Sequence, residues 1–335
     1  LMVDSLIVWA EQYKVDAFRF DLMGHHMKSN MEKVQTTLAA IDPTIYIYGE
    51  GWNFGEVADN QRGENATQLN MAGTGIGTFS DRLRDAVRGG GPFDEGAAIV
   101  ANQGFISGVY YDPNDSNSGS DAEKAEMLLS ADQIRVGLAG NLADYEFENA
   151  AGEIVKGSQI DYNGSPAGYN QDPQEHIVYV SKHDNETLWD ITQFKLPSAT
   201  SMAERVQVQN LGIDFTVLAQ GVPFLHAGVD LLRSKSLDRD SYNSGDWFNK
   251  LDFTYADNNW GKGLPPHSNA PEARLQELLA NSDLAPAQAD METSAQHLRD
   301  MLAIRNSTPL AQSARWVPAP TRRKALLPTR DPRRP

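Results

Sequence analysis

The stretch Val15-Asp-Ala-Phe-Arg-Phe-Asp21 is a run of strand-type residues that ends in a carboxylate. Two later stretches repeat the pattern, Ile45-Tyr-Ile-Tyr-Gly-Glu50 and Ile177-Val-Tyr-Val-Ser-Lys-His-Asp184. A (β/α)8 barrel builds its site on one face from parallel strands that carry acids at their C-terminal ends. The three stretches therefore predict an α/β fold with functional acids at its strand ends.

The apolar periodicity around these stretches predicts helices that alternate with strands. Two further short strands are expected at 76–79 and 222–226. All of them together make about five of the eight strands of a barrel. We therefore expect a partial (β/α)8 TIM barrel that holds about strands 4 to 8 and lacks the first strands. The expected helices cover 1–14, 30–40, 81–88, 203–211 and 294–305.

The two ends of the chain differ from its middle. Leu1 opens an apolar helix without a preceding cap, so we expect the chain to begin inside a larger protein. Residues 1–312 would then be the C-terminal portion of a catalytic barrel, with a partly helical excursion rich in Gly, Asn and Asp at 92–175. Residues 313–335 hold six Arg and five Pro against a single Asp. We interpret them as a disordered or non-native tail rather than a nucleic-acid-binding arm.

The composition argues against several classes of partner. The chain has 335 residues, is 40% hydrophobic and carries a net charge of -16. Nucleic acids and anionic membranes select for clustered Lys and Arg, so neither is an expected partner. The sequence contains no run of about 18 apolar residues that would predict a membrane span. It also contains no cysteine, which excludes disulfides and thiolate chemistry.

Arg19 and Asp21 lie two residues apart in the first stretch, so their side chains project to the same side of a strand. A guanidinium beside a carboxylate keeps the acid ionised, as a nucleophile requires. The alternative is a purely structural ion pair at a strand end.

Glu50 stands between two glycines and precedes Trp52. Glycines let a substrate approach the backbone, and an apolar ring beside a carboxyl favours the protonated form that a general acid needs. Trp52 is a candidate surface for stacking a sugar, with ordinary core packing as an equal alternative. A turn with a solvated Glu would explain Gly-Glu-Gly by itself.

His183 and Asp184 follow the third acid-bearing strand. An imidazole donor and a carboxylate together can bind vicinal hydroxyls of a sugar, although a lone His-Asp is more often a structural pair. Three such acids at three strand ends fit the hydrolysis of a glycosidic bond, which uses a nucleophile and an acid.

Three motifs carry a family resemblance: Phe18-Arg-Phe-Asp-Leu-Met-Gly-His25, Tyr48-Gly-Glu-Gly-Trp52 and Val180-Ser-Lys-His-Asp-Asn-Glu-Thr-Leu-Trp-Asp190. They resemble the second, third and fourth signature regions of the α-amylase family of glycoside hydrolases. More narrowly, they are similar to type I pullulanases and limit dextrinases, as are 233–249 and 258–266.

The resemblance implies a retaining hydrolase that cleaves α-1,6-glucosidic branches of pullulan, limit dextrins and starch- or glycogen-derived glucans. Asp21 would be the nucleophile, Glu50 the general acid and base, and Asp184 the acid that grips the distorted sugar. Retaining enzymes hold their nucleophile and acid about 5–5.5 Å apart. The chemistry requires no cofactor, and an α-glucan is the expected partner.

The resemblance also assigns supporting residues. Arg19 would orient the nucleophile and His183 would bind the same sugar as Asp184. Arg239 and Asp240 look like the family's contacts for the next sugar along. The closest-looking members imply a secreted or cell-surface bacterial location, and the sequence leaves the oligomeric state open.

Parts of the family pattern are absent, namely the first signature region, the starch-binding N-terminal domains and the C-terminal β-sandwich. Two alternatives therefore stay open. One is a catalytically incomplete carbohydrate-binding fragment, and the other is an α-1,4-acting amylase or branching relative.

Structural calcium is a further expectation, since members of this family often bind it, but the sequence assigns no ligands. Residues 115–126 invite a calcium-loop interpretation, yet Gly119 falls at the fifth position rather than the sixth. A polar surface loop is favoured there. Metal binding at the adjacent His25 and His26 is a weaker hypothesis.

Overall fold

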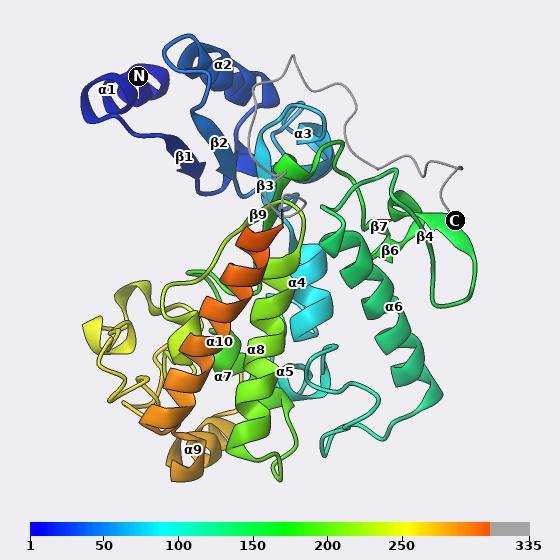
Figure 1. The fold of residues 1–335 in the computed structure, drawn as a ribbon, viewed down its shortest axis with the longest axis vertical. Coiled ribbons are helices and arrows are strands. Elements are labelled where there is room, and N and C mark those ends of the chain that lie inside the picture. The colour runs from blue at the N-terminus through cyan, green and yellow to red at the C-terminus, as the bar shows by residue number, and fades with distance from the viewer. Residues whose placement is uncertain (309–335) are drawn as a thin grey trace. The chain divides into compact units, whose positions relative to one another are not determined.

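A computed structural model describes residues 1–308, which form two compact units, 1–77 and 78–308 (Figure 1). The predicted tail at 313–335 lies outside the described residues. Among the residues that are described, no helix is both long and apolar enough to span a membrane.

The first unit contains two parallel strands and their connecting helix. Strands β1 (Ala17–Phe20) and β2 (Tyr46–Gly49) pair so that Phe20 lies opposite Gly49. This register brings the residues that follow, Asp21 and Glu50, to the same end of the pair. The helices of this unit are α1 (Met2–Tyr13), α2 (Lys28–Ala39) and α3 (Gln68–Met71).

Helix α2 closes one side of the first unit's core. Its buried residues Met31, Val34 and Leu38 recur at a spacing of three and four, as an amphipathic helix requires. They share one apolar cluster with Ile45 and Ile47 from the stretch around β2. Burial of these side chains fixes β2 and therefore the position of the acid after it.

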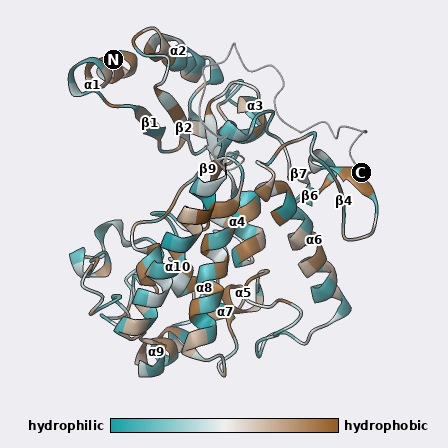
Figure 2. Ribbon diagram, in the orientation of Figure 1, coloured by the Kyte–Doolittle hydropathy of each residue, from teal (hydrophilic) through white to brown (hydrophobic). Residues whose placement is uncertain are grey.

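The second unit contains three parallel strands, β3 (Gly77–Phe79), β8 (His176–Val178) and β9 (Val222–Pro223). Figure 1 shows the two long helices α8 (Met202–Leu218) and α10 (Gln288–Ser307) side by side. Both carry hydrophobic and hydrophilic residues (Figure 2), and buried hydrophobic residues such as Ile213 and Leu298 belong to the unit's main core. The other helices are α4 (Asp81–Arg88), α5 (Ala98–Ala101), α6 (Asp121–Leu138), α7 (Leu188–Lys195) and α9 (Glu272–Ala280).

The expected α/β class with parallel strands is confirmed, because all five predicted strands are present. Closure into a barrel and the numbering of its strands stay predictions. The predicted strand at 222–226 is shorter than expected, because β9 ends at Pro223. Residues 92–175 are partly helical as predicted. They also contain two small hairpins that were not predicted, β4–β5 (Glu146–Glu148, Ile154–Lys156) and β6–β7 (Asp161–Tyr162, Ser165–Pro166).

Candidate active-site residues

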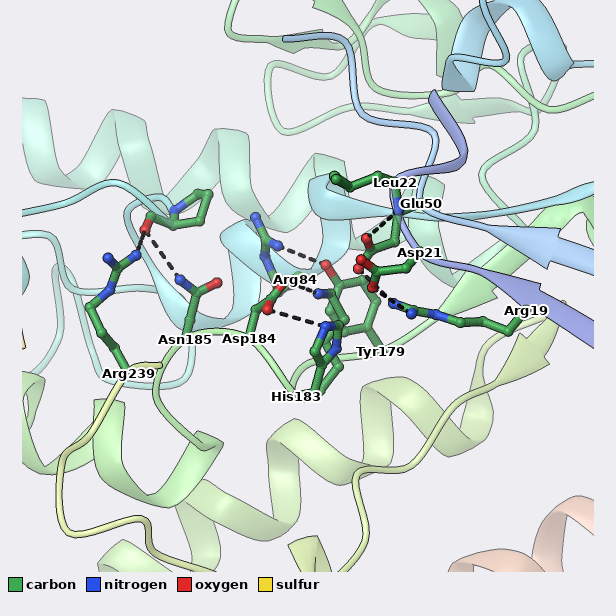
Figure 3. Close-up of polar contacts among 12 residues, drawn as sticks. Arg19, Asp21, Leu22, Glu50, Arg84, Tyr179, His183, Asp184, Asn185 and Arg239 are labelled. Carbon is green, nitrogen blue, oxygen red and sulfur yellow. Dashed lines mark hydrogen bonds and ion pairs between the residues drawn. The ribbon is translucent and has the colours of Figure 1, made fainter. Parts of the chain in front are cut away.

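Arg19 joins two of the predicted acids in the first unit (Figure 3). Its Nη1 donates to Asp21 Oδ1 at 2.6 Å, and its Nη2 donates to Glu50 Oε1 at 2.7 Å. The two carboxylates are therefore held by the two arms of one planar guanidinium, a geometry that only Arg provides. The predicted pairing of Arg19 with Asp21 is present, and its second bond to Glu50 was not predicted.

The two acids differ in exposure. The Asp21 side chain is 59% exposed, whereas that of Glu50 is 2% exposed. Glu50 Oε2 also accepts a hydrogen bond of 3.0 Å from the backbone N–H of Leu22. Both oxygens of this buried acid thus have donors, which differs from the apolar surroundings that we expected for it. Asp21 is open to a reactant, while Glu50 is fixed.

The backbone around these acids is tightly packed and partly strained. Leu22 directly follows Asp21 and has φ 47°, a left-handed conformation that costs a residue with a Cβ about 1–2 kcal/mol. Gly49 precedes Glu50, and a Cβ on it would lie 2.6 Å from the carbonyl oxygen of Phe20. Such strain is typical of positions that the surrounding structure holds in place for a function.

Trp52, His25 and His26 lie in the same unit. Trp52 is half-buried, and its stacking on a sugar stays a prediction. His25 packs edge-on against Phe54, with ring centroids 5.1 Å apart, and its Nε2 lies 3.8 Å from Glu56 Oε1. The metal hypothesis for the two histidines stays a prediction.

Asp184 lies in the second unit between two basic side chains (Figure 3). Its Oδ2 accepts a hydrogen bond of 2.6 Å from Lys182 Nζ, and its Oδ1 lies 3.2 Å from His183 Nε2. Lys182 is 4% exposed at its side chain, whereas Asp184 is 46% exposed. The predicted pair of His183 and Asp184 is present, and Lys182 was not predicted as a partner.

Arg239 and Asp240 lie on the loop that precedes α9. Arg239 Nη2 donates to the carbonyl oxygen of Pro92 at 2.8 Å, and Asn185 Nδ2 donates to the same oxygen at 3.2 Å (Figure 3). Arg239 is therefore tied to the residue next to Asp184. The backbone N–H of Asp240 bonds Asp238 Oδ1 at 2.8 Å. This bond fixes the backbone at Asp240.

A neutral histidine borders the segment that carries Asp184. Arg233 Nη1 lies 3.0 Å from His226 Nε2, and Ser181 Oγ lies 2.9 Å from His226 Nδ1. Since Arg can only donate, Nε2 accepts and Nδ1 carries the proton toward Ser181. Burial and the neighbouring Arg233 lower the pKa of His226 to about 3.

Residues 115–126, considered above as a calcium loop, contain the start of a helix. Ser120 caps α6, since its Oγ accepts from the Glu123 N–H at 3.3 Å while Glu123 Oε2 accepts from the Ser120 N–H at 2.5 Å. Because α6 begins at Asp121, the second half of the segment is helical rather than part of a polar loop. Glu123 acts as a helix cap, which is the ordinary use of this spacing.

Comparison with known proteins identifies related sequences and structures. Residues 255–314 match the family described as α-1,6-glucosidases, pullulanase-type, C-terminal. The chain is 46% identical to pullulanase 1, chloroplastic, of Arabidopsis thaliana over 92% of its own length and 33% of that protein. It is 45% identical to the pullulanase of Klebsiella pneumoniae over 92% of its length and 28% of that protein.

The chain belongs to the pullulanase family. Its structure is similar to PulA of Klebsiella oxytoca, with a TM-score of 0.86 at 44% identity, covering 93% of this chain and 29% of that one. It is also similar to a maltotriose complex of PulA from Klebsiella pneumoniae, with a TM-score of 0.83 at 43% identity, covering 93% of this chain and 33% of that one. The chain thus spans about a third of the length of the pullulanases that it matches.

Proposed function

We propose that this chain carries the catalytic acids of a retaining glycoside hydrolase that cleaves α-1,6-glucosidic branches in pullulan, limit dextrins and related α-glucans. The observation that carries the proposal is the shared guanidinium of Arg19, which holds an exposed carboxylate and a buried one in a chain of the pullulanase family. A retaining mechanism needs such a close pair of carboxyl groups. The partial (β/α)8 barrel, strands 4 to 8, is the scaffold that we propose for it.

In the first step, Asp21 attacks the anomeric carbon and forms a glycosyl ester, while Glu50 gives its proton to the departing sugar oxygen. At this stage the Asp21 carboxylate pairs with the Arg19 guanidinium. Once Asp21 is esterified, Glu50 alone faces Arg19. In the second step the Glu50 carboxylate removes a proton from the attacking water, which releases the sugar from Asp21.

We assign the remaining predicted residues to substrate contacts. Asp184 would hydrogen-bond the hydroxyls of the sugar being cleaved and favour its distorted form, with His183 as a second contact. Lys182 supports this role because it holds one carboxylate oxygen of Asp184 in place. Arg239 and Asp240 would contact the next sugar, and Trp52 would stack on a sugar face.

The maltotriose complex of the related Klebsiella pneumoniae PulA supports an α-glucan as the ligand of this chain. We further propose that no organic cofactor takes part and that any calcium ion has a structural role. A secreted or cell-surface location belongs to the same proposal, since the family resemblance implies it.

Covalent trapping tests the proposal directly. The purified chain is incubated with 5-fluoro-α-glucosyl fluoride, and intact-mass spectrometry measures the adduct. We expect one 5-fluoroglucosyl adduct on the wild-type chain, formed as the anomeric fluoride leaves and located on Asp21 by peptide mapping, and none on Asp21→Asn. Release of maltotriose from pullulan should exceed release of sugars from linear maltooligosaccharides, and the reverse preference would favour an α-1,4-acting relative.

The alternative is a carbohydrate-binding fragment without catalysis. Equal, negligible pullulan hydrolysis by the wild-type chain and by Asp21→Asn, together with maltotriose binding in calorimetry, would support that alternative and reject the proposal.

A further inference from the structure

The segment 180–186, which carries Asp184, runs between β8 and α7 without regular structure. Arg88, at the end of α4, holds both ends of this segment through backbone carbonyls. Its Nη1 donates to the Val180 oxygen at 2.9 Å and its Nη2 donates to the Glu186 oxygen at 3.0 Å. One buried guanidinium therefore fixes the distance between the start and the end of the segment.

A second buried cation holds the middle of the same segment. Lys235 Nζ donates to the carbonyl oxygen of Asn185 at 2.7 Å and to that of His183 at 3.3 Å. These are the carbonyls on either side of Asp184. The backbone of Asn185 has φ 62°, a left-handed conformation. An irregular segment with such a residue needs outside contacts to keep one conformation.

The position of Lys235 is itself fixed by a buried acid. Asp190 Oδ2 accepts the backbone N–H of Lys235 at 2.7 Å, and Asp190 Oδ1 accepts Ser234 Oγ at 2.6 Å. Lys235 is 1% exposed and Asp190 is fully buried. Burying an ammonium group is costly unless strong hydrogen bonds compensate. The compensating bonds of the Lys235 ammonium go to the segment around Asp184.

We propose that Lys235, together with Arg88, is a positioning residue that holds the backbone on both sides of Asp184 and so sets the direction of its carboxylate. Neither cation binds the Asp184 side chain in this arrangement; each acts through main-chain oxygens. The consequence for catalysis rests on the proposed function, whereas the positioning itself does not.

A change in the protonation of Lys235 should change its hydrogen bonds to the segment, and this change can be measured. Burial lowers the pKa of Lys235 to about 8. The charge of Asp190 partly opposes this shift, and the charge of Arg233 adds to it. Asp238 and Glu186 also face it and favour its charge. Arg88 stays charged throughout, because a guanidinium does not titrate in this range. The hydrogen bond to Asn185 should therefore weaken near pH 8, when the ammonium becomes a neutral amine.

The hydrogen bond from Lys235 to the Asn185 carbonyl can be followed by NMR without overlap from other residues. Asn185–Glu186 is the only Asn–Glu step in the chain. Labelling with carbonyl-¹³C Asn and ¹⁵N Glu therefore gives a single HNCO cross-peak, which reports the Asn185 carbonyl. In the wild-type chain we expect its ¹³C shift to titrate with a midpoint near pH 8. In Lys235→Met the peak should move upfield and lose this titration.

Lys195 provides the matched control. It is also 1% exposed, its Nζ donates to the carbonyls of Gly89 at 2.6 Å and Asn102 at 2.5 Å, and burial lowers its pKa to about 8. Lys195→Met removes an equivalent buried ammonium that lies near Arg88 and Glu186 but donates its own hydrogen bonds to other carbonyls, so the Asn185 signal should keep its titration. A wild-type signal that does not titrate, or one that Lys195→Met changes as much as Lys235→Met, overturns the proposal.

Kinetics supply the second readout. We expect Lys235→Met to lower kcat on pullulan by about 10²-fold with a smaller change in KM, because a misplaced catalytic group costs about this much. The wild-type kcat should also fall above pH 8, and this limb should be absent in Lys235→Met. An unchanged kcat in an active enzyme rejects the proposal. If the wild-type chain is as inactive as Asp21→Asn, the proposed function fails, and the Asn185 signal alone decides the positioning role.

Discussion

Arg19 binds the buried carboxylate of Glu50 at 2.7 Å, although the two residues are 31 positions apart in the chain. The bond depends on the parallel register of β1 and β2, which places both strand ends together. The same guanidinium also binds Asp21, so Arg19 holds the two carboxylates close to each other.

Arg19→Lys should separate the pair. An ammonium is a point charge without the planar fork, so it can hold one carboxylate well but not both. We expect kcat/KM on pullulan to fall by about 10²-fold, in line with the cost of a misplaced catalytic group. Initial rates measure the effect. Lys28→Arg, at a more distant ion pair of the same unit, is the control and should leave the rate unchanged. A wild-type rate for Arg19→Lys would show that the planar guanidinium is not needed to hold Asp21 and Glu50 together.

Gly49→Ala should destabilise the first unit. The added Cβ would lie 2.6 Å from the Phe20 carbonyl oxygen and 2.8 Å from Met23 Cβ, so the backbone at the end of β1 must shift. Overpacking of this kind costs about 1–3 kcal/mol. Urea unfolding measures the loss. Gly91→Ala is the control, because its Cβ would meet only Asp94 Oδ1 at 3.9 Å. Equal stability of the two variants would contradict the prediction.

The buried lysines predict an unusual alkaline stability profile. Burial lowers the pKa of Lys195 and of Lys235 to about 8 from the ordinary 10.5. Between these values the unfolded chain binds more protons than the folded one, so the free energy of unfolding rises with pH. Above pH 10 the trend reverses, since burial raises the pKa of Tyr169 to about 12.

Urea titrations from pH 7.5 to 11 check this profile. The expected maximum lies near pH 10, and the double variant Lys195→Met/Lys235→Met should lose the rise that precedes it. A wild-type curve that falls steadily from pH 8 would show that these lysines are not buried as charged groups.

Acid should destabilise the second unit through its buried histidines. Burial lowers the pKa of His176 and of His226 to about 3 from 6.5. Below pH 6.5 the unfolded chain binds protons that the folded chain does not, so stability falls as the pH falls toward 3. Asp190 opposes this trend, because burial raises its pKa to about 6.

Because both histidines act in the same direction, we expect a net loss. His176→Gln should reduce the pH dependence of the free energy of unfolding between pH 6.5 and 4 by about one proton. Thermal or urea unfolding across this range measures it. A variant with the same slope as the wild type would argue against a buried, neutral His176.

Ser120→Ala should weaken the start of α6. The hydroxyl caps the Glu123 N–H, and loss of such a cap costs about 0.5–2 kcal/mol. Urea unfolding, with Ser116→Ala as the control, measures the difference. Both variants should respond equally to a chelator, since the cap needs no ion. A calcium-dependent loss confined to Ser120→Ala would favour the loop interpretation instead.

The local pattern predicted much of this fold, and the reasons are physical. Strands β1 and β2 follow from short runs of strand-type residues that end at an acid, and the pair of Arg19 and Asp21 follows from the two-residue alternation of a strand. Helix α7 (Leu188–Lys195) was not predicted. All eight of its residues are buried although four of them are polar, so the pattern of polar residues in the sequence does not reveal which face is exposed.

The contacts that hold the candidate site were harder to predict. Arg88 reaches a carbonyl 92 positions away and Lys235 reaches one 50 positions away. Each is a single basic residue whose partner is a main-chain oxygen, and main-chain oxygens carry no sequence signal. The second bond of Arg19, to Glu50, was missed for a related reason, because strand register is set by tertiary packing.

A single cation shared by Asp21 and Glu50 also makes the two acids energetically inseparable. Removing either charge changes the electrostatic surroundings of the other, so single substitutions will not report independent contributions. A substitution at one carboxyl will therefore act on the other as well. Any redesign of this candidate site must treat the three side chains as one unit.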